Sequence, residues 1–381
     1  MASEHVISRL DAFAYRYPIE RPVETSFGRM TDRPAVFLGF DANDGCFSWC
    51  DVFANWPAEG PEHRVNLLAR DIAPLVLGRS IRMPSDFFDA LTRRTRLWAL
   101  QSGEWGPFRQ VIAGLDTALW DLKARAAKLP LRRLLRADAP DEVPAYASGI
   151  PIMTAGEHVK VARAAGFSAF KVKVGFDMAQ DLRQLETLSQ DIRPDERLFA
   201  DANQAFGVDE AKRFLKATAG MGLGWLEEPI PADAPPDDWS DVAAMATTPL
   251  AAGENIAGDE AFAQLIDSGP FHFIQPDLAK WGGVTGCYRV AQAALAAGRV
   301  YCPHFLGGGI GLAASAEVLA AAGGDGLLEV DVNPNPLRTA FAFPGLNAQG
   351  RWPAVTGVGL GIDRIPERLT DYVTHSACMT A

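Results

Sequence analysis

The feature that most constrains the fold is a regular alternation of short apolar runs and longer amphipathic segments, which begins at about Val143. The apolar runs have the length of buried strands, and the segments between them have the length and apolar spacing of helices. Strands are expected at 143–148, 169–174, 198–201, 224–227, 250–254, 271–277, 299–304 and 327–329. Helices are expected at 155–165, 178–190, 208–219, 237–245, 259–267, 286–297 and 310–322. This alternation predicts parallel strands, and eight of them predict a closed α/β barrel over residues 141–340, a modified TIM-type (β/α)7β barrel.

Residues 1–140 lack this alternation. Strands are expected at 8–17, 35–41 and 46–51, and helices at 62–77, 84–100 and 108–127. Strands followed by helices predict an α+β domain. The polar, turn-rich segment 18–34 is expected to be a long loop, of the kind that often serves as a lid. Residues 341–381 lose the alternation again and are expected to pack back on the N-terminal domain.

Composition argues against several classes of function. The 47 acidic and 36 basic residues give a net charge of −11, which disfavours nucleic acid or an anionic membrane as the main partner. The five cysteines are scattered and form no disulfide framework, and Cys46 and Cys50 have no second pair with which to build a zinc site. The N-terminus has no secretory signal, and no apolar run reaches the roughly 20 residues that span a bilayer. A cytoplasmic protein is therefore expected.

The ends of seven successive barrel strands carry ionisable residues, at intervals of 23 to 28 residues. They are Lys171 with Lys173, Asp201, Glu227, Glu254, Asp277, His304 and Glu329. The carboxyl ends of all barrel strands face one mouth, where the active sites of such barrels lie. One strand-end carboxylate is commonly a helix cap or a solvated loop residue. Seven strands in succession are hard to explain in that way, so the sequence predicts a shared site.

Asp201, Glu227 and Glu254 end three neighbouring strands. Three adjacent carboxylates repel one another unless a cation holds them, and ligands that are all oxygen suit Mg²⁺, with Mn²⁺ as an alternative, better than zinc. Lys171 and Lys173 share one face of their strand, so each is expected to lower the pKa of the other, as a general base requires. Taken alone, the two lysines also fit an edge strand whose charged side chains prevent aggregation with other chains.

On the other side of the carboxylates stands His304, with Asp277 one strand back. A carboxylate beside an imidazole fixes its tautomer and raises its pKa. The predicted arrangement is therefore a metal ion that is flanked by two potential bases.

These residues lie in motifs that resemble the enolase superfamily and, within it, the mandelate racemase subgroup. The matching motifs are Lys171–Val172–Lys173, Asp201–Ala202–Asn203, Leu226–Glu227–Glu228–Pro229, Gly253–Glu254–Asn255, Pro276 to Gly286, Leu328 to Asp331, and the helical run Ala113 to Asp121. The resemblance covers nearly the whole chain and implies an N-terminal capping domain, with specificity loops near residues 18–34 and 51–60. It departs from mandelate racemase at the glycine-rich turn 305–311, for which a tight turn into a helix and a close approach to substrate both stay open.

The resemblance also implies roles for individual residues. The metal ligands would be Asp201, Glu227 and Glu254. Lys173 would be the base on one face of the substrate, with Lys171 beside it contacting the substrate carboxylate, and His304 with Asp277 would act on the other face. Glu329 would hydrogen-bond the substrate carboxylate as a protonated acid. The implied substrate contacts are Asn203, Lys280, Arg29, Trp56 and Phe27.

The function that follows is Mg²⁺-dependent abstraction of the α-proton of a small-molecule carboxylate through an enolate. Dehydration of a hydroxy acid, such as an acid sugar, to a 2-keto acid is the favoured outcome. Racemisation or epimerisation between the two bases is the alternative, and a non-catalytic metal-binding barrel is a remote one. A homo-oligomer is expected, with no nucleic acid and no membrane as partner.

Overall fold

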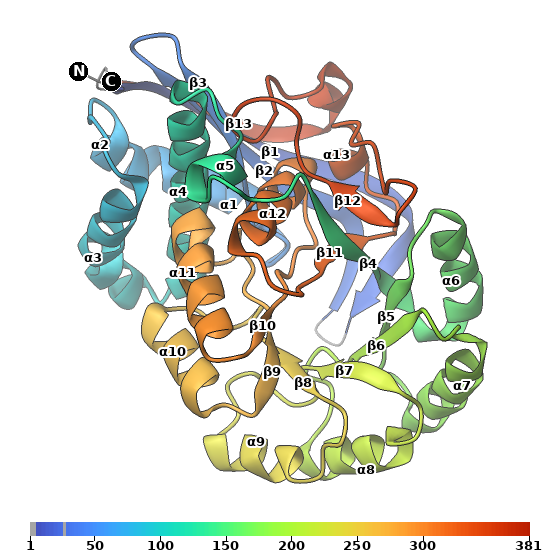
Figure 1. The fold of residues 1–381 in the computed structure, drawn as a ribbon. Coiled ribbons are helices and arrows are strands. Elements are labelled where there is room, and N and C mark those ends of the chain that lie inside the picture. The colour runs from blue at the N-terminus through green and yellow to red at the C-terminus, as the bar shows by residue number, and fades with distance from the viewer. Residues whose placement is uncertain (1–4, 26–27) are drawn as a thin grey trace.

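A computed structural model describes residues 5–25 and 28–381 of the chain (Figure 1). The N-terminal part is a four-stranded antiparallel sheet in the order β13–β1–β2–β3, covered by helices. Its strands are β1 (Ile7–Thr25), β2 (Gly28–Ala42), β3 (Phe47–Val52) and β13 (Val373–Thr380). Its helices are α1 (Gly60–Leu67), α2 (Ala73–Val76), α3 (Pro84–Ser102), α4 (Trp105–Ala126) and α5 (Leu131–Leu135).

Helix α4 packs on β3 and carries the apolar spacing expected for residues 108–127. Val111, Leu115, Ala118 and Leu122 recur on one face and are all buried in the core of this domain. The helix expected at 62–77 is instead interrupted by a π-helical turn at Leu68–Ile72. Pro74 lies just beyond this turn and has no N–H to donate to the preceding turn, so the regular hydrogen-bond pattern cannot continue through it.

The segment 18–34 is not the irregular loop that was expected. It forms the paired ends of β1 and β2, which extend the hairpin so that Val23 faces Met30 and Thr25 faces Gly28. From Gly28 to Asp32 the residues of β2 are at least partly exposed, whereas Ala35 to Phe40 are buried. These two strands therefore belong to the domain core at one end and project as a two-stranded arm at the other.

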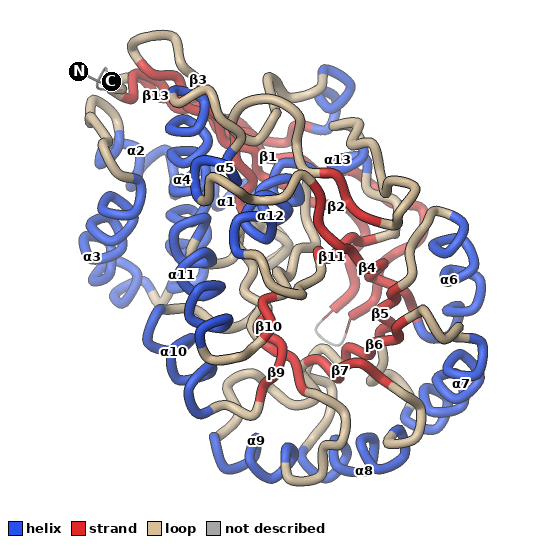
Figure 2. The backbone as a smooth tube through the Cα atoms, in the orientation of Figure 1, coloured by secondary structure: helices blue, strands red, loops and turns tan. Residues whose placement is uncertain are grey.

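The second part is the predicted barrel of parallel strands. The strands are β4 (Glu142–Pro151), β5 (Ala169–Lys173), β6 (Arg197–Asp201), β7 (Leu223–Glu227), β8 (Leu250–Ala252), β9 (Phe271–Ile274), β10 (Val300–Tyr301) and β11 (Leu328–Asp331). Between them run α6 (Ala155–Ala164), α7 (Met178–Asp191), α8 (Val208–Thr218), α9 (Pro236–Ala243), α10 (Asp259–Ser268), α11 (Gly283–Ala296) and α12 (Gly309–Ala322). Figure 2 shows these strands surrounded by helices. The fold prediction is confirmed.

The sheet runs β10–β9–β8–β7–β6–β5–β4–β11, and within residues 5–25 and 28–381 no strand ladder joins its two ends. Two contacts bridge them instead: the Leu327 N–H lies 3.4 Å from the Cys302 sulfur, and the Phe305 N–H donates to Glu329 at 3.0 Å. Helix α12 follows β10, and every one of its residues is buried. It packs against both β3 and β11, so this helix lies between the two domains.

The C-terminal segment contacts both parts of the molecule. After α13 (Pro336–Thr339), strand β12 (Arg351–Pro353) pairs with the N-terminal end of β4, and β13 pairs with β1. Among the described helices, none is long and apolar enough to cross a membrane.

Candidate active site

Strand register brings the first predicted residues together. Lys173 lies opposite Asp201 between β5 and β6, and Asp201 lies opposite Glu227 between β6 and β7. Glu254, Asp277 and His304 follow β8, β9 and β10 by two or three residues, and Glu329 lies in β11. All of them except Lys173 are buried, so the ends of seven strands form one desolvated polar cluster.

On one side of this cluster, the two lysines hold carboxylates. Lys171 Nζ donates to both oxygens of Glu227 at 2.7 and 2.8 Å and lies 2.7 Å from Glu329 Oε1. Lys173 Nζ donates to Asp201 Oδ2 at 2.5 Å. The side chain of Lys171 is inaccessible to solvent and that of Lys173 is 13% exposed, so Lys173 is the lysine that a substrate can reach.

On the other side, His304 lies between two carboxylates. Its Nδ1 is 2.8 Å from Asp277 Oδ2, and its Nε2 is 2.5 Å from Glu254 Oε2. Asp277 is itself fixed because its Oδ1 accepts the N–H groups of Ala279 and Lys280. The second carboxylate oxygen therefore orients the imidazole, and Nε2 faces the centre of the site.

The carboxylates reverse the expected pKa shift of the lysines. Burial lowers the pKa of Lys171, but Glu227 and Glu329 outweigh burial and raise it well above its usual value. Burial and Lys171 lower the pKa of Lys173, yet Asp201 and other carboxylates raise it. Repulsion between the lysines is present, as predicted, but the prediction of lowered pKa values is wrong for these surroundings.

The expectation of a protonated Glu329 is also not supported. Burial raises its pKa, but the positive charges of Lys171 and His304 outweigh burial and hold the pKa of Glu329 below its usual value. His304 shows the matching effect. Burial lowers its pKa, whereas Glu254 and Glu329 raise it well above its usual value. These groups therefore form a network of ionised pairs.

The donor set fits a hard divalent cation. Among the described residues, the polar cluster contains six buried carboxyl groups, those of Asp201, Glu227, Glu228, Glu254, Asp277 and Glu329. Four basic groups, Lys171, Lys173, Lys280 and His304, contact members of this set, so an excess of two negative charges remains if all are ionised. Glu228 Oε1 has no hydrogen-bond partner although it is buried, and burial together with Glu254 raises the pKa of Glu228 to about 8. A bound dication would balance this excess.

The remaining predicted substrate contacts lie in different places. Asn203 is nearly buried beside the metal-ligand candidates, and its N–H donates to Asp201. Lys280 Nζ is 3.1 Å from Asn255 Oδ1 and 4.9 Å from the Phe53 ring centre, which joins the barrel to the capping domain. Arg29 lies on the projecting arm of β2 and is exposed. Phe27 lies outside the described residues.

Trp56 connects the two expected specificity segments. A side-chain carbon added at Gly28 would lie 2.6 Å from the Trp56 ring, so the ring of the 51–60 segment rests against the hairpin arm. The carbonyl of Trp56 accepts a hydrogen bond from Arg64 at 2.9 Å. Trp56 therefore contacts the arm through its ring and helix α1 through its carbonyl.

Three residues that the sequence analysis did not select complete the cluster. Ser148, in the C-terminal half of β4, donates to Glu329 Oε1 at 2.5 Å. Gln275 and Trp225 donate to Glu227 Oε2 at 2.8 and 3.2 Å. Ser148 could have been found because it ends the predicted strand 143–148, the one predicted barrel strand whose end carries no ionisable residue. Gln275 and Trp225 carry no signal of this kind because both lie within apolar runs.

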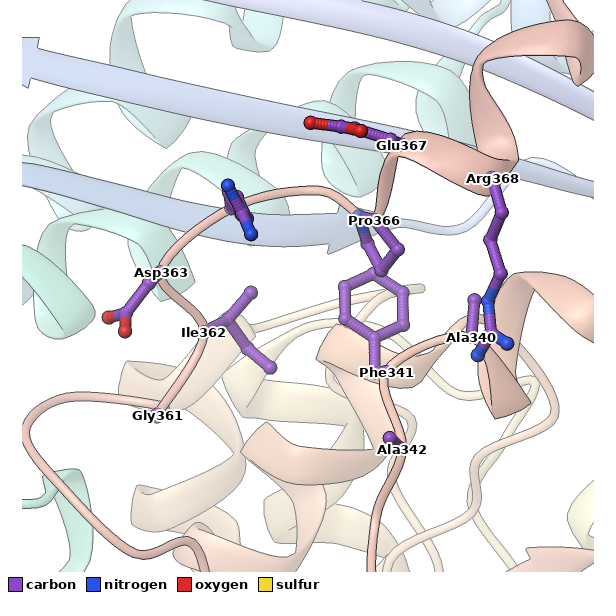
Figure 3. A pocket seen from close by; sticks show the side chains of 10 residues that line it. Ala340, Phe341, Ala342, Gly361, Ile362, Asp363, Pro366, Glu367 and Arg368 are labelled. Carbon is purple, nitrogen blue, oxygen red and sulfur yellow. The ribbon is translucent and has the colours of Figure 1, made fainter.

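Two further features lie apart from the polar cluster. The hollow in Figure 3 is lined by residues 340–342, 361–364 and 366–368, and no member of the polar cluster lines it. His5, Asp44 and Cys46 come together at the turn between β2 and β3. There Asp44 already pairs with His5 at 2.7 Å and accepts the Cys46 N–H, which gives each of its oxygens a structural role.

A parallel eight-stranded barrel, capped by an α+β domain and carrying bases and carboxylates at its strand ends, defines an enzyme of the enolase superfamily. A family model described as "Enolase C-terminal domain-like" matches residues 154–368. Another, described as "Mandelate racemase / muconate lactonizing enzyme, N-terminal domain", matches residues 9–136. The chain belongs to the mandelate racemase/muconate lactonizing enzyme family, as the motifs predicted.

Curated relatives in this family carry out different reactions. D-galactarolactone cycloisomerase of Agrobacterium fabrum is 28% identical over 370 residues, which cover 93% of this chain and 95% of that protein. L-talarate/galactarate dehydratase of Salmonella typhimurium is 34% identical over 245 residues, which cover 62% and 60% of the two chains.

Solved structures show the same fold. A mandelate racemase/muconate lactonizing enzyme from Bordetella bronchiseptica RB50 is 41% identical, with a TM-score of 0.89 over 97% of this chain and all of that chain. An enolase from Bradyrhizobium, solved with magnesium and mandelic acid, is 29% identical, with a TM-score of 0.85 over 98% of this chain and all of that one.

Proposed function

We propose that this enzyme removes the α-proton of a hydroxy acid, such as an acid sugar, and expels the β-hydroxyl as water to give a 2-keto acid. Lys173 takes the α-proton on one face, and His304, oriented by Asp277, gives a proton to the leaving hydroxyl on the other. The enol that results becomes the keto acid by losing its hydroxyl proton and taking up a proton at the β-carbon. The observation that supports this most directly is that Lys173 and His304 contact different carboxylates, Asp201 and Glu254, on the two sides of the cluster.

Asp201, Glu227 and Glu254 are the proposed ligands of Mg²⁺, and Mn²⁺ is a possible substitute. When bound, the metal supplies charge that stabilises the enolate and lowers the pKa of the neighbouring lysines. Lys171 and Glu329, joined at 2.7 Å, contact the substrate carboxylate. Asn203, Lys280 and the capping residues Arg29, Trp56 and Phe27 are proposed to contact the rest of the substrate.

Racemisation or epimerisation is the second candidate, because two acid–base groups on opposite sides also allow proton return to the other face. One experiment separates the two. Acid sugars and other hydroxy acids are incubated with the enzyme and Mg²⁺ in D₂O, and both 2-keto acid and deuterium at Cα are measured. Keto acid formation supports dehydration, whereas deuterated substrate of inverted configuration without keto acid supports racemisation.

We further propose a homo-oligomer. Leu97 and Leu100 on α3 are 61% and 49% exposed, and burying such side chains between copies would be favourable. Light scattering during gel filtration tests this proposal.

A further inference from the structure

The two helices that follow the Asp277 and His304 loops both begin without a side-chain cap. Helix α11 starts after Gly282 and helix α12 starts after Gly308, and neither glycine can offer an acceptor to the free N–H groups of the first turn. Each helix begins only a few residues after Asp277 or His304, so it directly follows the loop that carries that residue. Their first turns therefore need acceptors from elsewhere.

The capping domain supplies a carboxyl group to each of them. Asp116 of α4 accepts the Thr285 N–H at 2.8 Å and the Thr285 hydroxyl at 2.6 Å, at the start of α11. Asp51 of β3 accepts the Gly311 N–H at 3.4 Å, at the start of α12, and also faces the N–H of Gly308. Asp51 and Asp116 are 3% and 2% exposed.

This contact explains part of the glycine-rich turn. A side-chain carbon at Gly308 would collide with Asp51 Oδ2 and would lie 2.6 Å from the Phe37 ring. A side-chain carbon at Gly283, where φ is +55°, would lie 2.6 Å from Asp116 Oδ2. Gly283, the first residue of α11, and Gly308, which precedes α12, thus make room for carboxyl groups from the other domain.

The chain that leaves β3 continues this contact. The Phe53 N–H donates to the carbonyl of Ala279, two residues after Asp277, at 3.4 Å. The Asn55 amide donates to the carbonyl of Leu306, two residues after His304, at 3.5 Å. One face of the capping domain therefore holds both loops of the His304–Asp277 pair.

We propose that Asp51 and Asp116 are positioning residues that hold His304 and Asp277 in place by accepting the first N–H groups of α12 and α11. This inference rests on the proposed function for its kinetic test. Burial raises the pKa of Asp51 to about 8, so hydrogen-bond acceptance matters here more than charge. An asparagine, which keeps an acceptor oxygen, should therefore replace Asp51 better than an alanine.

The experiment compares Asp51→Ala with Asp51→Asn and with a matched control, Asp121→Asn. Asp121 is a buried carboxylate of α4, as Asp116 is, but it accepts hydrogen bonds from the N–H groups of Leu360 and Trp49 and from Arg125, and not from the first turn of α11 or α12. Deuterium exchange at Cα is measured separately on the lysine and histidine faces of the substrate. In Asp51→Ala, exchange on the histidine face should fall by up to roughly tenfold, the size expected for loss of one ordinary hydrogen bond.

In the same variant, exchange on the lysine face should stay close to wild type. Asp51→Asn should recover most of the histidine-face rate, and Asp121→Asn should leave the ratio of the two faces unchanged. Equal losses on both faces, or an unchanged ratio in Asp51→Ala, would overturn the proposal. Asp116→Ala provides the second variant if Asp51→Ala does not fold, with the same expected change in ratio.

A measurement without substrate separates this inference from the proposed function. The NMR signal of the His304 ring, assigned from His304→Asn, should shift in Asp51→Ala and stay in place in Asp121→Asn. An unshifted His304 signal overturns the positioning role, whatever reaction the enzyme performs. Absence of any exchange by the wild-type enzyme, with a shifted signal, would overturn the proposed function and leave the positioning role supported.

Discussion

Removal of either proposed base should abolish turnover while leaving metal binding intact. Lys173→Ala removes the partner that holds Asp201 at 2.5 Å, and Lys171 remains 3.5 Å from the same oxygen. His304→Asn removes the group that lies between Asp277 and Glu254. Each change takes one positive charge from a cluster that already has more carboxylates than bases.

The magnitudes follow from these contacts. General acid–base groups contribute about 10²–10⁴ in rate, so each variant should lose about 3–5 kcal/mol of transition-state stabilisation. Because each variant adds one uncompensated negative charge beside the metal-ligand candidates, Mg²⁺ should bind at least as tightly as in wild type. A lower kcat with unweakened metal binding separates a catalytic role from a structural one.

The assay uses both variants in D₂O with one substrate isomer. The base that survives in each variant acts on its own face, so one variant should exchange the α-proton without turnover and the other should not. Metal affinity is measured in parallel by calorimetry. Identical exchange in the two variants would refute the assignment of two bases to opposite faces. Only the proposed metal site would then remain supported.

Three further outcomes are expected. EDTA should abolish activity, and Mg²⁺ should restore it. Glu227→Gln should weaken Mg²⁺ binding in calorimetry, since an amide removes one ligand charge. Full activity in enzyme that elemental analysis shows to lack metal would contradict the proposed site. Trp56→Ala should raise KM or lower kcat with little change in Tm, because its ring contacts the projecting arm at Gly28; kinetics equal to wild type would reduce Trp56 to a loop anchor. Burial raises the pKa of Asp51 from 3.8 to about 8, so its contribution to stability is fully present below about pH 4 and is lost as the pH rises through about 8. Relative to wild type, Asp51→Asn should therefore gain at most about 4 kcal/mol of stability between pH 5 and pH 9 in urea unfolding; parallel pH dependence of the two proteins would show that Asp51 does not carry this cost.

Local periodicity was enough to define the barrel. Strand β5 was expected at 169–174 and occurs at Ala169–Lys173, and helix α8 was expected at 208–219 and occurs at Val208–Thr218. Burial on one face of a helix or within a parallel sheet repeats at a fixed spacing, so neighbouring residues carry the signal. The strand-end positions of the charged residues could be read for the same reason, since a charge ends an apolar run.

Partners that are distant in the chain could not be assigned in this way. Ser148 bonds to Glu329, which lies 181 residues away, and Asp51 reaches Gly311 across 260 residues. Neither pairing has a spacing that a sequence can display, because only closure of the barrel and docking of the capping domain bring these groups together. The arm formed by the ends of β1 and β2 was not predicted, because the turn-forming residues of segment 18–34 indicated a loop and not two paired strands.

The sequence by itself determined which ionisable groups meet at the mouth of the barrel, but not their charge states. The two lysines were expected to lower each other's pKa, as neighbours on one strand face do. Tertiary structure places Glu227, Glu329 and Asp201 within 3.5 Å of Lys171, and these opposite charges outweigh both burial and repulsion. Electrostatic energy depends on distances and desolvation in three dimensions, so only the folded chain could decide the sign.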